Sequence, residues 1–336
     1  MKRLAFLFWI FLAPAFVASA GGGNLFEITA TKFLLGTQVD IIAMAPQVAR
    51  GKQACYLAFK EIERIEQRFS SHLPNSEISS INQSPGKPVK VSYETFALLL
   101  RAKKYSQNFN GDFDVSIGPL TRLWGFNDDQ KITLPDSSRL AALLQFVDYQ
   151  KILLNARDTT VTLARRGMRL DLGGIAKGYA IDRAAKILRE QEIENFLINA
   201  GGDIYAAGVK APGRKWAIGI KHPRRLEALI ARFELQDYAV ATSGDYERFA
   251  IINGKRYHHI LNPKTGYPAK LNQSVTVLAP TAEEADVWAT YLFILGYSRY
   301  KQKFPHSPVE ALFVDAAGKL HYDTSLVQHY AFEFLQ

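Results

Sequence analysis

Apolar residues follow two different periods along this chain of 336 residues. Cys55, Phe59, Ile62, Ile65 and Phe69 recur at spacings of three and four, the pattern of one buried helical face. Other segments carry short apolar runs bounded by turn residues, which is typical of strands. A chain that mixes both patterns has to pack helices against sheets, so helix-only and strand-only folds are excluded.

The remaining elements support this interpretation. Residues 26–45 predict two strands on either side of Leu35-Gly36-Thr37, and residues 152–154 and 161–163 predict two more. Residues 93–108 predict a helix that Ser92 can cap. Helix and strand patterns then alternate to the end of the chain. We therefore expect an α+β or mixed α/β layered fold with a single domain over residues 21–336.

The first 20 residues have the composition of a secretory leader. Lys2 and Arg3 precede an apolar run, and the run ends in Ala18-Ser19-Ala20, small residues of the kind that signal peptidase accepts. An uncleaved membrane anchor is the alternative, but Pro14 interrupts the run, which is also short for a bilayer. We predict cleavage after residue 20 and export to the periplasm. No cysteine follows the leader, so the sequence predicts no lipid attachment and only indirect association with a membrane.

Composition narrows the function classes. Hydrophobic residues make up 48% of the chain and charged residues 22%, which excludes a disordered protein. The formal charge of +9 is spread thinly, which favours general attraction of anions over a nucleic-acid groove, so no nucleic-acid partner is predicted. Cys55, the single cysteine, cannot form an internal disulfide and is expected to be a buried thiol.

Residues 169–182 contain a paired glycine, Gly173-Gly174, between a predicted strand end and a predicted helix start. Glycines permit close approach of the backbone to a ligand, and free N–H groups at a helix N-terminus attract phosphate. The segment is neither a Walker loop nor a Rossmann fingerprint. A tight turn that needs glycine for packing explains it equally well.

Two further segments place polar groups beside strands. Asn199 and Asp203 flank two glycines after a buried run, which indicates either a ligand crevice at a strand end or a plain turn. A hairpin is predicted at Asn253-Gly254. Beyond it, His258 and His259 point to opposite faces if the segment is a strand, so at most one of them faces a given site.

Residues 281–293 predict a helix that begins with a capping box formed by Thr281 and Glu284. Asp286 and Thr290 are four residues apart and share a face of this otherwise apolar helix. A buried carboxylate and hydroxyl need partners. The partner could be a neighbouring basic side chain or a backbone N–H. Alternatively, it could be a hard cation such as Mg²⁺ or Ca²⁺.

Together and in this order, the motifs resemble the FAD:protein FMN transferase family, the ApbE-type flavin transferases. The resemblance covers nearly all of residues 21–336. The segments that carry it are 35–37, 68–70, 76–78, 113–115, 118–120, 123–126, 171–178, 199–203, 242–244, 259–263, 285–286 and 289–290.

The resemblance implies a T-fold-like architecture and an enzyme that binds FAD and Mg²⁺. It implies transfer of FMN through a phosphoester to a threonine of an acceptor flavoprotein, with release of AMP. Subunits of Na⁺-translocating NADH:quinone oxidoreductase (Nqr) or of Rnf-type complexes are the implied acceptors.

The matching positions imply roles for individual residues. The metal ligands would be Gly174, Asp286, Ala289 and Thr290. The FAD site would contain Leu35, His72, Phe113, Asp114, Val115, Asp171, Lys177 and Ile260. His259 matches the functional histidine of the family, and either it or an aspartate, Asp171 or Asp245, would handle the acceptor's proton.

Three positions depart from the family pattern. Leu35 stands where methionine is frequent, His72 where tyrosine is frequent, and Asn262 where aspartate is usual. Two alternative functions remain open: a Mg²⁺-dependent hydrolase that splits FAD into FMN and AMP, and a non-catalytic periplasmic FAD-binding protein.

Overall fold

A large antiparallel sheet forms the centre of the molecule. The computed structural model describes residues 10–11, 15–17, 25–126, 132–225 and 227–335. The strand order is β1-β3-β4-β8-β9-β12-β15-β16-β17, and β2 also pairs with β3. The strands are β1 (Ile10–Phe11), β2 (Ala15–Val17), β3 (Leu25–Leu34), β4 (Thr37–Ala45), β8 (Asn195–Ala200), β9 (Asp203–Ala207), β12 (Tyr238–Gly244), β15 (Asn272–Ala279), β16 (Glu310–Asp315) and β17 (Leu320–Tyr322).

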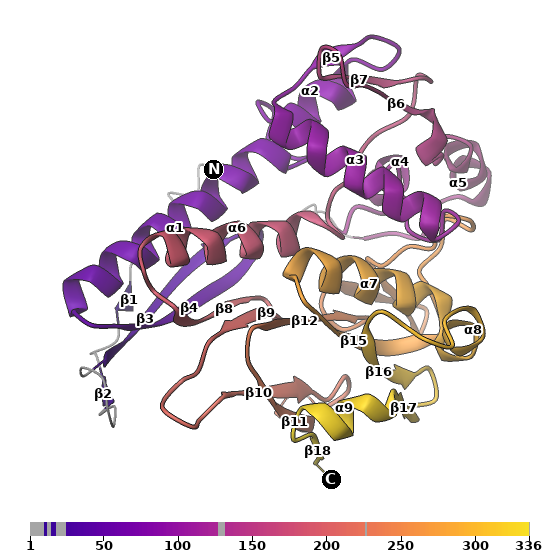
Figure 1. Ribbon diagram of the computed structural model, residues 1–336. Helices are drawn as coiled ribbons and strands as arrows, with labels where there is room; N and C mark the ends of the chain where they lie inside the picture. The colour runs from indigo at the N-terminus through magenta and orange to yellow at the C-terminus, as the bar shows by residue number, and fades with distance from the viewer. Residues whose placement is uncertain (1–9, 12–14, 18–24, 127–131, 226, 336) are drawn as a thin grey trace.

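Three helices cover one face of this sheet: α1 (Val48–Phe69), α6 (Ala176–Glu190) and α7 (Ala282–Leu295) (Figure 1). The predicted apolar face of α1 is confirmed, because Cys55, Phe59, Ile62, Ile65 and Phe69 are all buried. Helix α7 is buried along nearly its whole length. Thr281 caps α7 through its hydroxyl, which accepts a hydrogen bond from the Glu284 N–H at 3.2 Å, as the capping box predicts.

The opposite face of the sheet packs on a smaller sheet of β10 (Trp216–Lys221), β11 (Leu229–Leu235) and β18 (Glu333–Phe334) (Figure 1). Trp216 and Phe233 are buried between the two sheets. The short helix α9 (Thr324–His329) lies beside the smaller sheet, and α8 (Tyr297–Lys303) follows α7. The result is three layers, with helices, a large sheet and a small sheet stacked in turn.

The other elements extend beyond these layers. They are α2 (Glu77–Gln83), β5 (Val89–Lys90), α3 (Tyr93–Asn108), α4 (Gly118–Trp124), α5 (Ser137–Leu144), the 3-10 turn Tyr149–Lys151, β6 (Ile152–Asn155) and β7 (Thr160–Leu163). A separate hairpin is formed by β13 (Phe249–Ile252) and β14 (Lys255–His258). Ser92 caps α3 by accepting the Thr95 N–H at 3.2 Å, so the predicted start of this helix is confirmed.

The α+β layered class is therefore confirmed, with two local differences. The strand expected before Gly173 forms only a single bridge, between Ile117 and Arg169. Residues 199–203 form the tight turn of the β8–β9 hairpin, in which Gly201 and Gly202 adopt positive φ values of +63° and +101°. The backbone is therefore a plain turn, and Asp203 at its end also lines the cavity described below.

Most of the predicted leader lies outside the described residues. The described parts, β1 and β2, pair with β3. Leader cleavage stays a prediction. In the part of the chain that the structure describes, no helix combines the length and apolar character needed to cross a bilayer.

Candidate active site

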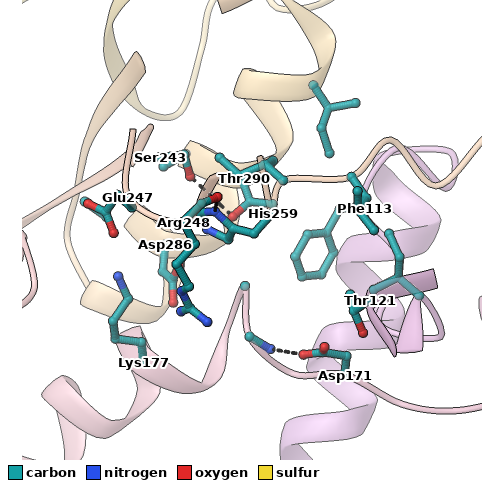
Figure 2. A pocket seen from close by; sticks show the side chains of 18 of the residues that line it. Phe113, Thr121, Asp171, Lys177, Ser243, Glu247, Arg248, His259, Asp286 and Thr290 are labelled. Atoms are coloured by element: carbon teal, nitrogen blue, oxygen red, sulfur yellow. Dashed lines mark hydrogen bonds between the residues drawn. The ribbon is translucent and has the colours of Figure 1, made fainter. Parts of the chain in front are cut away.

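A cavity of about 160 Å³ lies where α6, α7 and the end of β12 meet the segments around residues 113 and 259. Figure 2 shows Lys177, Glu247 and Asp286 on one side of it, and Phe113 and Asp171 on the other. The cavity thus collects side chains that are more than 170 residues apart in the sequence.

The floor of the cavity is the contact between α6 and α7. A Cβ atom at Gly178 would lie 2.1 Å from the Ala282 carbonyl oxygen, so only glycine lets the two helices approach this closely. The Gly178 N–H donates to Asp286 Oδ2 at 3.0 Å. Asp182 accepts hydrogen bonds from the Ala282 and Glu283 N–H groups and so caps α7 from α6. The glycine therefore serves packing and also brings a backbone donor to the carboxylate.

Asp286 and Thr290 both line the cavity, as their spacing on α7 predicts. The Thr290 hydroxyl is 3.5 Å from Ser243 Oγ. A Cβ at Gly174 would lie 3.3 Å from Thr290 Oγ1 and 3.1 Å from the Phe113 ring, so the Gly174 backbone forms a narrow cradle with both. Burial, followed by the charge of Asp203, raises the pKa of the Asp286 carboxyl.

Lys177 and Asp203 form an ion pair at the same end of the cavity, with 2.7 Å between Nζ and Oδ2. Burial alone would lower the pKa of Lys177. The carboxylates of Asp203, Asp286 and Glu247 outweigh burial, so the net shift raises this pKa and keeps the amine protonated. Lys177 is therefore a fixed positive charge beside Asp286.

The cavity as a whole is acidic. Its charged lining residues are the carboxylates Asp112, Asp114, Asp171, Asp203, Glu247 and Asp286 and the cations Lys177 and Arg248. A diphosphate could not enter such a site without further positive charge. Among the described residues no group of three or more His, Cys, Asp or Glu side chains is arranged to hold a metal.

A magnesium ion fits these features. Mg²⁺ is commonly held by one or two carboxylates together with water and substrate phosphate oxygens. The Asp286 carboxylate, the Thr290 hydroxyl and the backbone around Gly174 and Ala289 offer only hard oxygen ligands, which Mg²⁺ prefers over zinc. A bound cation would also offset the burial and the charge of Asp203 that raise the pKa of Asp286.

Asp114 and Asp171 both line the cavity, but each also supports the backbone. Asp114 accepts hydrogen bonds from Ser116 N at 2.8 Å and from Tyr149 N at 2.9 Å, so both of its oxygens are engaged. Asp171 Oδ1 accepts from Gly173 N at 2.8 Å and fixes the glycine turn. The second carboxylate oxygen of Asp171 is able to contact a ligand.

Only one of the two neighbouring histidines faces the cavity, as predicted. His258 is buried, and its Nε2 lies 2.7 Å from the Ala269 carbonyl oxygen. His259 lines the cavity, and its backbone N–H donates to the Arg248 carbonyl at 3.1 Å. Burial, then the charge of Arg248, lowers the pKa of His259 to about 3. The imidazole is therefore neutral at pH 7 and able to accept a hydrogen bond, while its low pKa makes it a weak base.

Most of the predicted site residues come together in this cavity. They are Phe113, Asp114, Val115, Asp171, Gly174, Lys177, His259, Ile260, Asp286, Ala289 and Thr290. Asp245, the alternative proton acceptor, is instead bound by both guanidinium nitrogens of Arg224 at 2.6 Å.

Leu35 and His72 do not line this cavity. Leu35 occupies the β3–β4 turn, where its N–H donates to Glu66 Oε1 at 2.9 Å. His72 lines a neighbouring depression with Arg122 and Arg169, and Thr121 borders both spaces. Contact of Leu35 and His72 with FAD stays a prediction. Asn262 accepts hydrogen bonds from Lys264 N and Thr265 N, an interaction that an aspartate oxygen would also make.

The sequence analysis missed Asp203, Glu247 and Arg248 as site residues. Asp203 stood in a recognised motif, but its approach to Lys177 depends on the β8–β9 turn. Glu247 and Arg248 lie three and four residues after Gly244, the end of the Thr242-Ser243-Gly244 motif, and that proximity was the available signal.

Comparison with known proteins agrees with this geometry. The profile of the ApbE family matches residues 35–313. This chain belongs to the ApbE family. A protein named FAD:protein FMN transferase from Klebsiella pneumoniae is 38% identical over 246 residues, which cover 72% of this chain and 75% of that protein. Another of that name, from Treponema pallidum, is 33% identical over 322 residues, or 89% of this chain and 87% of that protein.

Solved ApbE structures share the fold. The crystal structure of the ApbE protein from Thermotoga maritima superposes with a TM-score of 0.85 at 33% identity, over 90% of this chain and 98% of that one. The flavin transferase ApbE from Vibrio cholerae gives a TM-score of 0.81 at 29% identity, over 93% of this chain and all of that one. The family and enzyme class predicted from the motifs are thus confirmed.

Proposed function

We propose that this protein transfers FMN from FAD to a threonine hydroxyl of an acceptor flavoprotein, with Mg²⁺ bound and AMP released. The observation that carries the proposal is the acidic cavity in which Asp286, Thr290 and the Gly174 backbone converge beside a neutral histidine. The names of the relatives support the flavin transfer itself.

The reaction balances as a substitution at phosphorus. The threonine oxygen forms a bond to the phosphorus on the flavin side of the pyrophosphate, and the bond from that phosphorus to the bridging oxygen breaks. AMP leaves with the bridging oxygen, and the hydroxyl proton passes to a base. Phosphoryl transfer of this kind depends mainly on positioning and on neutralising charge.

The residues divide these tasks. Asp286, Thr290 and the backbone at Gly174 and Ala289 would hold Mg²⁺, which supplies positive charge for the pyrophosphate oxygens when bound. Lys177 adds a second positive charge, fixed by Asp203. The Asp171-Gly173 turn shapes the wall opposite Asp286 (Figure 2). His259, neutral and close to this group, is the proposed hydrogen-bond partner of the threonine hydroxyl. It would take the proton once the negative charge of the bound pyrophosphate raises its pKa.

Export to the periplasm is part of the proposal and rests on residues 1–20. The proposed acceptor is a flavoprotein subunit of an Nqr or Rnf type of complex, with the membrane contacted only through that partner. Both parts derive from the motifs of the sequence.

An assay of products tests the function. The purified protein is incubated with FAD and MgCl₂, with and without an Nqr-type acceptor domain that carries the threonine. AMP release is followed together with flavin fluorescence on a denaturing gel. Fluorescence that is covalent, acceptor-dependent and lost in Asp286→Ala supports the transferase. Glu284→Gln, on the same helix but outside the cavity, is the matched control.

The other outcomes are equally defined. AMP production with water as the only nucleophile, and no labelled acceptor, would indicate the FAD hydrolase. Tight FAD binding without any AMP would overturn both enzymatic functions and leave the FAD-binding protein.

A further inference from the structure

The β13–β14 hairpin is joined at its base to the cavity. Arg248 directly precedes β13 and His259 directly follows β14, and both line the cavity. Their backbones are bonded to each other, since His259 N–H donates to the Arg248 carbonyl at 3.1 Å. Within the described residues the two strands pair only with each other. The hairpin therefore extends outward from the rim of the site.

Two adjacent side chains at the end of β14, one on each side of the hairpin, anchor it. Tyr257 stacks on Trp124, with 5.6 Å between the ring centroids, and belongs to the small core around Trp124 and Leu261. His258 is buried and bonded to the Ala269 carbonyl. These contacts hold the hairpin without help from Phe249 or Ile251.

Phe249 and Ile251 are instead exposed, at 39% and 57% of their surface. They are two residues apart on one strand and so share a side. The Arg256 guanidinium lies 3.8 Å from the centroid of the Phe249 ring and donates to the Asp245 carbonyl. Arg256 is the register partner of Ile251 and shares their side, whereas Lys255, the partner of Ile252, is exposed on the other side of the hairpin. Apolar side chains that the fold does not need, at the rim of a site, are typical of a binding surface.

The charge of this surface differs in sign from that of the cavity. Residues 248–258 contain three cations, Arg248, Lys255 and Arg256, and no Asp or Glu. Arg224 is paired with Asp245, just before this segment, and that ion pair adds no net charge. A basic rim around an acidic cavity favours a partner with acidic and apolar side chains.

We propose that the β13–β14 hairpin is the docking surface for the acceptor protein and recognises an acidic, apolar segment next to the accepting threonine. This inference rests on the proposed transfer of FMN to a protein. Because β14 ends directly before His259, a macromolecule that brings its hydroxyl to His259 comes close to the hairpin. Exposed Phe249 and Ile251 would be covered in that complex. Lys255, on the other side and next to the turn, would face acidic groups of an acceptor that encloses the end of the hairpin.

The test separates acceptor recognition from flavin chemistry. Ile251→Asp and Lys255→Glu lie outside the cavity, and the matched controls are Leu153→Asp, also exposed, at 50%, and Lys104→Glu on α3. The KM for the acceptor domain, kcat and the Kd for FAD are measured for each. Thermal unfolding checks that the variants are folded.

We expect Ile251→Asp to raise the KM for the acceptor about tenfold and Lys255→Glu about fivefold, with the Kd for FAD unchanged. The effect of Lys255→Glu should shrink in high salt. The two controls should stay within about twofold of the wild type. If both hairpin variants match the controls while the wild type labels the acceptor, the docking surface is wrong. If the wild type labels no acceptor, the proposed function has failed instead.

Discussion

The floor and the rim of the cavity are built in opposite ways. The floor is the α6–α7 contact, where Gly178, Asp182 and Asp286 are tied together by backbone hydrogen bonds in a buried setting. The rim is the β13–β14 hairpin, where Phe249 and Ile251 face solvent and the two strands pair with each other. Changes to the floor should alter chemistry and stability, and changes to the rim should alter only the choice of partner.

The difference follows from what each region has to do. Charge on a transferring phosphoryl group is stabilised best by groups that are fixed before the reaction, which requires dense packing. A docking surface has to stay exposed until its partner arrives, so it cannot contribute much to the free energy of folding. The predictions below test this division, from the largest expected effect to the smallest.

Asp286→Asn should give the largest effect. It should lower the rate of FMN transfer without lowering the free energy of unfolding. Transfer of FMN should fall at least about 100-fold, because the neutral amide is a poor ligand for Mg²⁺. Unfolding of the metal-free protein should need no less free energy than in the wild type, because the raised pKa of Asp286 shows that burial disfavours its charge. Activity and metal-free thermal melting are compared with those of Glu284→Gln. A large loss of stability in Asp286→Asn would show that the buried Asp286 charge stabilises the α6–α7 contact and would contradict this prediction.

Gly178→Ala should destabilise the fold by about 3 kcal/mol, because its Cβ would meet the Ala282 carbonyl, a backbone atom that cannot rotate away. The comparison variant is Gly219→Ala on β10, whose Cβ would meet Cδ1 of Leu229, the end of a 40% exposed side chain, at 2.7 Å. Because the Leu229 side chain can move, the smaller loss is expected there. Urea denaturation at pH 7 measures both, and equal losses would show that the α6–α7 contact is not unusually rigid.

Glu94→Gln tests the hydrogen bonds that join α3 to α1 and to α6. Glu94 on α3 accepts hydrogen bonds from Arg64 on α1 at 2.6 Å and from Tyr179 on α6 at 2.7 Å. Burial acts to raise the pKa of Glu94, but these hydrogen bonds outweigh it and hold the pKa at about 2. We expect a loss of about 2 kcal/mol at pH 7.

The pH dependence of this loss has a definite sign. A carboxylate whose pKa is lower in the folded state stabilises the protein above its unfolded value, near 4.5, and that stabilisation disappears as the pH falls toward 2. The difference between wild type and Glu94→Gln should therefore shrink between pH 4.5 and 2. Glu333→Gln, which removes an exposed ion pair with Arg232, should change the stability by less than about 0.5 kcal/mol at either pH.

Ile251→Asp should have the smallest effect on folding. The free energy of unfolding should stay within about 0.5 kcal/mol of the wild type, since the side chain is 57% exposed. A loss of 2 kcal/mol or more in urea denaturation would show that the rim belongs to the core and would break the comparison.

Local patterns in the sequence determined the helices, their caps and the hairpin. The apolar face of α1, the Ser92 and Thr281 caps and the turn at Asn253-Gly254 were all predicted, because each depends on residues within a few positions of one another. The pairing of Asp286 with Thr290 was predicted for the same reason, as the helical repeat alone places them on one face. Ordered motifs added the family and, with it, most of the cavity.

Only the tertiary structure decided which residues from distant segments meet. The glycines of residues 169–182 could serve a ligand or packing, and only the position of the Ala282 carbonyl oxygen, 2.1 Å from a Cβ at Gly178, assigned that glycine to packing. Asp203 reaches Lys177 because a two-glycine turn reverses the chain, and His259 rather than His258 faces the cavity because the hairpin is anchored through Tyr257 on Trp124. Such contacts depend on packing between elements far apart in the chain, and no local pattern of residues encodes them.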